Sequence, residues 1–186
     1  MDYRLTGGRE VVTVRRMFID HIRIFAKAGD GGNGAISFRR EKYVPRGGPD
    51  GGDGGAGGDI VLVVDPSTDN LRQYHYDPKL VAKNGANGAG GRKSGRSGKV
   101  VIGKVPPGTV VYRTPAKNVQ EAVELERDET GIDLEPIADL TENGQEFVLC
   151  HGGKGGKGNW NFRTSTNRTP QEHTLGTDGE GGVYYL

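Results

Sequence analysis

Short runs in which apolar and polar residues alternate recur along this chain and predict β-strands. In the first run, Ile19–Ala28, the residues at 22, 24 and 26 are apolar while those at 23 and 27 are charged. A period of two places successive side chains on opposite faces of a strand. Short β-branched runs predict further strands over Ala35–Arg39, Ile60–Val64, Lys99–Val105, Thr109–Tyr112, Glu146–Cys150 and Val183–Leu186.

Turn sequences and one helical pattern complete the predicted elements. Pro106-Pro107-Gly108 predicts a turn between two strands, and Glu142-Asn143-Gly144 predicts a hairpin turn that leads into the strand at Glu146. Val119–Asp128 is the one run with apolar residues at helical spacing. We therefore expect a mainly β domain in which glycine-rich stretches form long excursions between the strands.

Glycine recurs at every third residue in the stretches between these strands. A polyproline II helix has about three residues per turn and no internal hydrogen bonds, so a row of glycines along one edge lets neighbouring backbones approach and bond each other. Gly48, Gly51, Gly54 and Gly57 form one row, and Gly52, Gly55 and Gly58 form a second row beside it. The structural glycines of this interpretation are Gly48, Gly51, Gly54, Gly57, Gly85, Gly88, Gly91, Gly152, Gly155 and Gly158, and Gly176, Gly179 and Gly182 repeat the period.

Two other interpretations of glycine-rich sequence fit this pattern less well. A flexible linker has no reason to keep a three-residue register over stretches that are interleaved with strands. Collagen keeps its period without interruption and has proline in the other positions, whereas these series stop after three or four triplets. The period therefore favours a packed structure.

The composition favours one domain in a reducing compartment. The 186 residues include a single cysteine, Cys150, so an intrachain disulfide is excluded. No apolar stretch approaches the roughly 20 residues that span a bilayer, and the N-terminus has no signal-peptide core, so we expect a cytoplasmic protein, with an organelle as the alternative. Residues 1–16 form a basic and apolar extension or a transit peptide, and Met17, where the first strand pattern starts, is a candidate native start.

The formal net charge of +1 conceals a segregation of charge along the chain. Residues 79–104 and 147–171 contain basic residues and no acidic ones. Acidic residues gather between Glu121 and Glu146, where Arg127 is the one basic residue. The nearly neutral total therefore includes a basic face, which would attract a polyanion.

Glycine and lysine occur together here without forming a phosphate-binding loop. That loop needs glycine five positions before its Gly-Lys pair, but Lys93 and His151 stand there for the pairs at 98–99 and 156–157. The run Gly29–Gly34 fits the dinucleotide pattern, but a predicted strand follows it instead of the helix that would bind a pyrophosphate. The four histidines are scattered, and the aspartates among the glycines lack EF-hand spacing. We therefore expect no catalytic residue, cofactor or metal in this chain.

Three basic segments, residues 38–46, 92–99 and 154–170, lie beside the glycine stretches, and the first and third contain aromatic residues. Cations bind phosphates while aromatic side chains such as Tyr43 and Trp160 stack on exposed bases, so the combination is typical of RNA binding. For any one segment the alternative is a solvated basic surface with its aromatics packed beneath the loop. The candidate RNA-binding residues are Arg39, Arg40, Lys42, Tyr43, Arg46, Arg92, Lys93, Arg96, Lys99, Lys154, Lys157, Asn159, Trp160, Arg163, Asn167 and Arg168.

Motifs in and between these segments resemble those of a known family. Residues 29–59, 104–110 and 167–170 are similar to segments of the N-terminal domain of the Obg (CgtA) GTPases, and they occur in the family's order. The resemblance covers nearly everything from Met17 to Leu186, which we take as one domain. It implies the Obg fold, in which glycine-rich polyproline II helices are bundled on a small β-barrel.

The resemblance also implies a function in assembly of the large ribosomal subunit. Members of the family are ribosome-associated GTPases whose tip loops reach into the peptidyl-transferase region, and the corresponding loops here would be Phe38–Asp59, Asn84–Lys99 and Gly152–Pro170. The implied partners are rRNA, ribosomal proteins and the protein's own GTPase domain. The resemblance implies no membrane partner and a monomeric protein. Family members continue beyond the position of Leu186 into that GTPase domain, which would bind GTP and magnesium. This chain lacks the phosphate loop, the magnesium ligand and the guanine-specificity motif of that domain, and it is therefore expected to be a fragment.

Two further hypotheses stay open. The acidic stretch around Val119–Leu134 resembles an insertion, and its acidity argues against contact with RNA. The chain would then be a regulatory domain that contacts its own GTPase domain or a stress-response partner. Alternatively, the chain is a free-standing, glycine-rich structural protein.

Overall fold

The computed structural model describes residues 21–40, 42, 47–115 and 134–186, and it is mainly β, as the sequence predicts. The described part contains one short α-helix, α1, and one short 3-10 helix, η1. The elements are β1 (Arg23–Lys27), β2 (Ile60–Val64), α1 (Arg72–Tyr76), β3 (Lys79–Val81), β4 (Val101–Val105), β5 (Thr109–Arg113), β6 (Glu135–Leu140), β7 (Glu146–Cys150), η1 (Asn159–Phe162) and β8 (Gly181–Tyr185).

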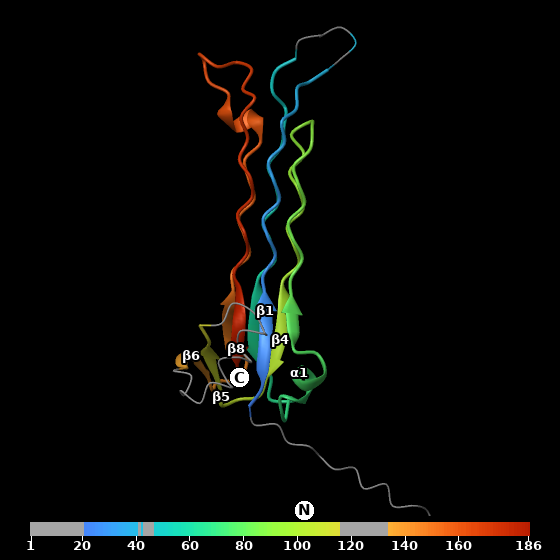
Figure 1. Ribbon diagram of the computed structural model, residues 1–186. Coiled ribbons are helices and arrows are strands. Elements are labelled where there is room, and N and C mark those ends of the chain that lie inside the picture. The colour runs from blue at the N-terminus through green and yellow to red at the C-terminus, as the bar shows by residue number, and fades with distance from the viewer. Residues whose placement is uncertain (1–20, 41, 43–46, 116–133) are drawn as a thin grey trace, which may run out of the picture.

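The described strands form two sheets and no single closed barrel. The larger sheet has the order β3-β1-β8-β5-β6, and the smaller has the order β4-β2-β7. In the larger sheet β1 pairs in parallel with β3 and antiparallel with β8. In the smaller sheet the central β2 pairs in parallel with β4 and antiparallel with β7. The sheets lie together at one end of the molecule (Figure 1), which we call the base.

Both sheets contribute to one hydrophobic core. Ile24 of β1, Leu62 of β2 and Val111 of β5 are fully buried in the same cluster. Helix α1 packs beside β4, where the Tyr74 hydroxyl donates a hydrogen bond to the Lys104 carbonyl oxygen at 2.9 Å. Burial raises the pKa of Tyr74 to about 12, so the hydroxyl stays protonated and able to donate at neutral pH.

The single cysteine lies inside this core. Cys150 at the end of β7 is fully buried, and its sulfur lies 3.4 Å from the Tyr184 hydroxyl oxygen. Burial raises the pKa of the Cys150 thiol, which disfavours the reactive thiolate. Cys150 should therefore react with an alkylating reagent only when the base opens.

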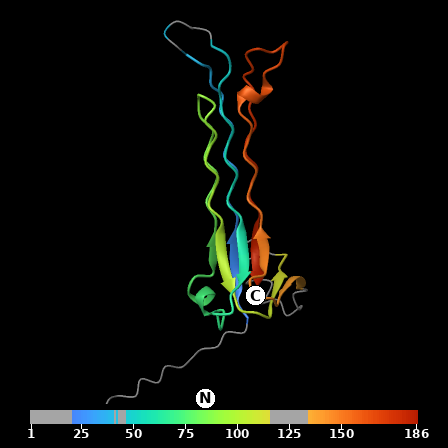
Figure 2. The same cartoon turned by 180° about the vertical axis from the view of Figure 1, so that it is seen from behind.

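Three long excursions leave the base on the same side and run next to one another (Figures 1 and 2). The first (residues 28–59) joins β1 to β2, the second (82–100) joins β3 to β4, and the third (151–180) joins β7 to β8. Each excursion has an outgoing and a returning leg, and we call the end of the legs far from the base the tip. The chain's last residue, Leu186, lies at the base, where its backbone pairs with Ile22.

Backbone hydrogen bonds join the legs of all three excursions, with the first in the middle. Gly32 N–H donates to the Gly55 carbonyl within the first excursion at 2.8 Å, Gly55 N–H donates to Ala86 of the second at 2.9 Å, and Gly54 N–H donates to Gly156 of the third at 2.8 Å. Each contact recurs three residues away, as Gly29 to Gly58, Gly58 to Lys83 and Gly57 to Gly153. The repeat follows the spacing of the glycines in the sequence.

The close approach of the legs explains why glycine is needed on these edges. A Cβ built on Gly54 would lie under 3.0 Å from the carbonyl oxygen of Gly32, and one on Gly57 would meet that of Gly29 equally closely. Such separations are essentially never seen for a real Cβ, and a backbone carbonyl in a bonded leg cannot rotate away. Glycine therefore permits the bundle by leaving room for the neighbouring backbone.

Polar side chains between the glycines supply further hydrogen bonds to the legs. Asp53 accepts from Gly158 N–H at 2.7 Å, and Asp59 accepts from Gly152 N–H at 2.7 Å. Asn33 accepts from Gly176 N–H at 3.0 Å. Related bonds are accepted by Asp30 from Gly179, Asn84 from Asp30, Asn87 from Asn33, Thr174 from Lys157 and Thr177 from Lys154. These side chains accept hydrogen bonds from backbone N–H groups that have no carbonyl partner on a neighbouring leg.

Several predicted elements differ from the observed ones. Ala35–Arg39 is not a strand: it pairs with the returning leg through one isolated bridge, Phe38 to Pro49, and beyond that bridge the Gly51 N–H donates to the side chain of Asn159 instead of extending a ladder. The Gly144 turn forms with a φ of 75°, but β6 and β7, which it joins, lie in different sheets and make no hairpin. The predicted helix at Val119–Asp128 and the extension at 1–16 lie outside the described residues.

Candidate nucleic-acid interface at the tips

The tips of the three excursions lie at the same end of the molecule, opposite the base (Figure 1). The second excursion turns at 89–93, where Ala89 and Lys93 form an isolated bridge, and the third turns through η1 and the residues that follow it. The loops implied by the family resemblance are thus longer than the tips, because residues 84–88, 94–99 and 152–158 form legs. In the first excursion, the described bond between the legs that lies furthest from the base runs from the Arg39 N–H to the Gly48 carbonyl at 3.0 Å.

An aspartate of the first excursion holds the turn of the second. Asp50 Oδ2 accepts the Gly91 N–H at 3.1 Å, and the Asp50 carbonyl accepts the Arg92 N–H at 2.6 Å. Gly91 and Arg92 have φ values of 73° and 57°, and Arg92 is the one non-glycine residue with positive φ in the described part of the chain. Because this conformation is costly for an arginine, the two bonds from Asp50 help to fix it.

The fixed turn directs Arg92 onto the tip of the third excursion. The Arg92 guanidinium carbon lies 3.3 Å from the centroid of the Trp160 ring, and that of Arg163 lies 5.7 Å from the same centroid. A guanidinium over an indole face is attracted to its π electrons, at about 0.5–1 kcal/mol when exposed. The stack joins the second and third tips, and it occupies one face of the ring that the sequence suggested for a base.

The tips enclose a cavity of about 580 Å³ with a strongly basic lining. All three excursions contribute to its walls, and the described residues of the lining include four arginines and one acid, Asp50. The lining residues are Arg39, Arg40, Gly48, Pro49, Asp50, Gly91, Arg92, Trp160 and Arg163. A concave site lined by four arginines suits an oxyanion such as phosphate.

Other predicted basic residues lie in rows along the legs. Lys93, Arg96 and Lys99 follow the returning leg of the second excursion from its tip towards the base, and all three are exposed. Lys154 and Lys157 are exposed on the outgoing leg of the third. A spacing of three puts each row on one edge of its leg, because the hydrogen bonds of the bundle repeat at the same interval. The basic surface therefore extends from the tips towards the base.

The remaining candidates differ in their accessibility. Lys42, Asn167 and Arg168 are exposed in the tip loops, whereas Tyr43 and Arg46 lie outside the described residues. Asn159 is fully buried, and its amide group accepts from Gly51 N–H at 2.8 Å and donates to the carbonyls of Ser37 and Pro170. Asn159 therefore ties the tips together and has no surface to offer to RNA.

The predicted structural glycines also fall into two groups. Gly51, Gly54, Gly57, Gly85, Gly88, Gly152, Gly155 and Gly158 each have a carbonyl oxygen of another leg where a Cβ would lie. At Gly48 a Cβ would meet nothing within 4 Å. Gly91 also has open space, and its requirement for glycine comes from its φ of 73° in the turn.

Sequence reasoning missed the polar residues that hold the tips and legs together. Asp30 and Asn33, Asn84 and Asn87, and Thr174 and Thr177 are each spaced by three residues, as the glycines are. This period was a signal that these side chains share the edges of the legs. Asp50 is likewise three residues before Asp53, but its contact with the turn at 91–92 depends on how the excursions assemble.

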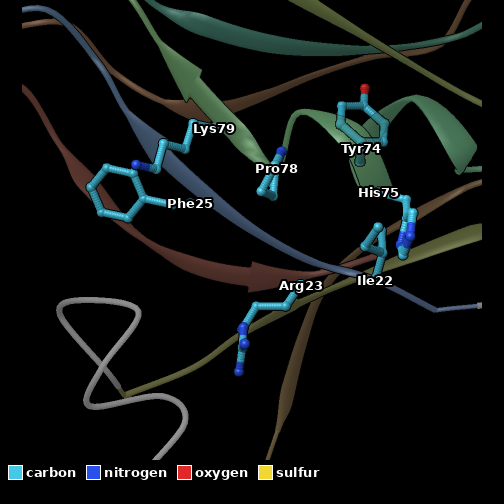
Figure 3. A pocket seen from close by; sticks show the side chains of 7 residues that line it. All are labelled: Ile22, Arg23, Phe25, Tyr74, His75, Pro78 and Lys79. Atoms are coloured by element: carbon cyan, nitrogen blue, oxygen red, sulfur yellow. The ribbon is translucent and has the colours of Figure 1, made fainter.

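A second cavity, of about 300 Å³, lies at the base and is unconnected with the predicted residues. Figure 3 shows its side chains, which come from β1, α1 and the residues leading into β3. The lining combines aromatic and cationic groups and consists of Ile22, Arg23, Phe25, Tyr74, His75, Pro78 and Lys79. Its position at the opposite end separates it from the tips.

Two other kinds of site are absent from the described residues. No group of three or more histidine, cysteine, aspartate or glutamate side chains in that part of the chain is placed to hold a metal ion. None of its helices combines the length and the apolar character needed to cross a bilayer.

Comparison with known proteins identifies close relatives. The profile of a family described as GTP1/OBG matches residues 19–186. A protein of Akkermansia muciniphila named GTPase Obg is 60% identical over 170 residues, which cover 91% of this chain and 49% of that protein. Proteins of the same name from Methylacidiphilum infernorum and Myxococcus xanthus are 44% and 48% identical, covering 91% and 88% of this chain and 47% and 30% of their own lengths. The chain thus spans about half or less of the length of these curated relatives.

Proposed function

The chain belongs to the GTP1/OBG family, and on this premise we propose that it is the domain by which a ribosome-associated GTPase docks on RNA of the large ribosomal subunit. The observation that carries the proposal is the position of the basic residues. The candidate basic residues that the structure describes are exposed on the tips and legs of a long bundle, away from the core, and residues 147–171 contain no acid.

The bundle suits a crevice lined with RNA. Its legs are thin because glycines replace side chains on their inner edges, and the backbone bonds between legs make it stiff. We infer that the legs are polyproline II helices, since they lack internal hydrogen bonds of the helical or strand type and bond their neighbours every third residue. A stiff arm of this kind would bring its arginines and lysines to buried phosphates without a large ordering cost.

The activity of the whole protein would reside outside this chain. Relatives named GTPase Obg are about twice as long or longer, and we propose that the additional part hydrolyses GTP with magnesium while the described domain selects the ribosomal site. The docking would then serve assembly of the large subunit, with the tips directed towards the peptidyl-transferase region. In this arrangement the tips determine where the protein binds, and the additional part hydrolyses GTP.

Binding to large ribosomal subunits should depend steeply on salt. Each phosphate that a lysine or arginine neutralises releases counterions, so about six such contacts would weaken binding by about 10³-fold between roughly 50 and 200 mM salt. Co-sedimentation of the purified chain with isolated large subunits over a potassium chloride series measures this slope. The small subunit, at the same RNA concentration, is the control for non-specific attraction. Binding that does not change with salt, or that is equal for both subunits, would contradict the proposal.

A further inference from the structure

We propose that the basic cavity between the tips is a discrete binding site for a phosphate group, either in RNA or in a free phosphate compound. The inference rests on the proposed function and goes beyond it, because docking on RNA requires only a diffuse basic surface, whereas a site requires convergent groups in a fixed arrangement. Three excursions that are far apart in sequence build this cavity, with Arg39 and Arg40 from the first, Arg92 from the second and Arg163 from the third.

The arginines suit phosphate by their number and by their freedom to donate. Arg40, Arg92 and Arg163 have no carboxylate partner among the residues that the structure describes. A guanidinium presents two parallel N–H groups that match two oxygens of a phosphate, and bonds of this charge-assisted kind are about twice as strong as neutral ones. Several such forks around one cavity would bind a phosphate at a defined place.

Arg92 is held ready for such a ligand. Its backbone is fixed by Asp50, and its guanidinium carbon lies 3.3 Å from the centroid of the Trp160 ring, so the side chain has lost much of its conformational freedom before any ligand arrives. Stacking uses the face of the guanidinium and leaves the N–H groups at its edge able to donate. Pre-organisation of this kind lowers the entropic cost of binding.

Asp50 is the one acidic residue among the described residues of the lining, and its role is to position Arg92. One carboxylate oxygen accepts the Gly91 N–H, while the other is buried with no hydrogen-bond partner among the described residues. The carboxylate faces the turn that it fixes. A phosphate would therefore be surrounded by the four guanidinium groups, with the Trp160 ring supporting one of them.

The cavity is large enough for more than a bare phosphate. Its volume of about 580 Å³ lies within the range of about 300–1,000 Å³ that is typical of small-ligand sites. The phosphate could come from an internal phosphodiester of RNA or from a free nucleotide or pyrophosphate. The same chemistry recognises both sources, and the experiment separates them.

Trp160 is the chain's single tryptophan, so its fluorescence reports on the cavity directly. The purified chain is titrated, at constant ionic strength, with inorganic pyrophosphate, with the RNA trinucleotide UpUpU lacking terminal phosphates, and with uridine. We expect a saturable, one-to-one change in Trp160 emission with pyrophosphate, with UpUpU or with both, and none with uridine. A response to UpUpU assigns the site to RNA, and a response to pyrophosphate alone assigns it to free phosphates.

Variants distinguish a built site from a diffuse basic surface. Arg163→Gln and Arg40→Gln should each weaken binding at least about 10-fold, because each loses charge-assisted hydrogen bonds. Arg96→Gln removes the same charge from a leg outside the cavity and should leave the affinity within about twofold. The absence of saturation with every phosphate, or equal weakening by Arg96→Gln and Arg163→Gln, would overturn the proposed site.

Large-subunit binding by the same variants separates this inference from the proposed function. If phosphate fails to saturate while salt-dependent docking on the large subunit persists, the cavity is not a site and the docking function stands. If phosphate binds in the cavity while large subunits do not bind at all, the site stands and the docking function fails.

Discussion

Replacement of Gly54 by valine should disrupt the bundle and abolish docking without removing a charge. A Cβ at this position would lie under 3.0 Å from the carbonyl oxygen of Gly32, and Gly54 N–H itself bonds Gly156 of the third excursion. Overpacking against a backbone that cannot move costs about 3 kcal/mol or more, and bonds broken when the legs separate add about 1 kcal/mol each. The change therefore approaches the roughly 5–15 kcal/mol that stabilises a whole domain.

Gly48→Val is the matched control. It makes the same chemical change in the same leg, but a Cβ there would meet nothing within 4 Å, so stability should change by no more than about 0.5 kcal/mol. Urea unfolding followed by Trp160 emission reports on the tips, and alkylation of Cys150 reports on the base. For Gly54→Val, Trp160 should become solvent-exposed at low urea. Equal stability of the Gly54→Val and Gly48→Val proteins would show that the legs are not packed as described.

Reversal of charge at the first tip should weaken binding to large ribosomal subunits by a large factor. Arg39→Glu with Arg40→Glu changes the local charge by four units and places carboxylates where phosphates would lie. Loss of two phosphate contacts and the added repulsion should lower affinity by about 100-fold or more at roughly 100 mM salt, and the salt slope should become shallower.

Arg72→Glu with Lys79→Glu controls for the change in net charge. Both residues are exposed, and they lie at the base, in α1 and β3. If docking is through the tips, this variant should bind large subunits within about threefold of the unchanged protein. Salt screens the interaction between RNA at the tips and charges as far away as the base of the fold. Equal loss of binding in both double variants would mean that total charge, and not the tips, determines binding.

The base of the fold was largely predictable from local patterns. β2 and β7 have the predicted bounds, because their apolar runs are uninterrupted and bounded by turn residues. β6 was missed because Pro136 breaks its pattern, and the proline is tolerated since β6 is an edge strand beside an irregular register in β5. α1 has five residues, which is too short for a helical period to be visible.

The tips were predictable in composition but not in geometry. Spacing alone indicated basic residues beside glycine rows, and most of those described are exposed. The stack of Arg92 on Trp160 joins residues 68 positions apart and depends on the turn held by Asp50, so no local pattern contains it. Asn159 was expected at an RNA surface because it follows a basic glycine stretch, yet the assembly of the tips buries it.

The central claim is that the bundle carries its tips to ribosomal RNA while its base stays outside. Site-specific photo-crosslinking tests this directly, with a photoreactive side chain at Lys93 on the second tip or at Val148 on the exposed face of β7. The protein is bound to large ribosomal subunits at low salt, and crosslinked rRNA is mapped by primer extension. The account predicts discrete rRNA crosslinks from position 93 and none from position 148. Crosslinks from position 148 with none from position 93 would contradict it.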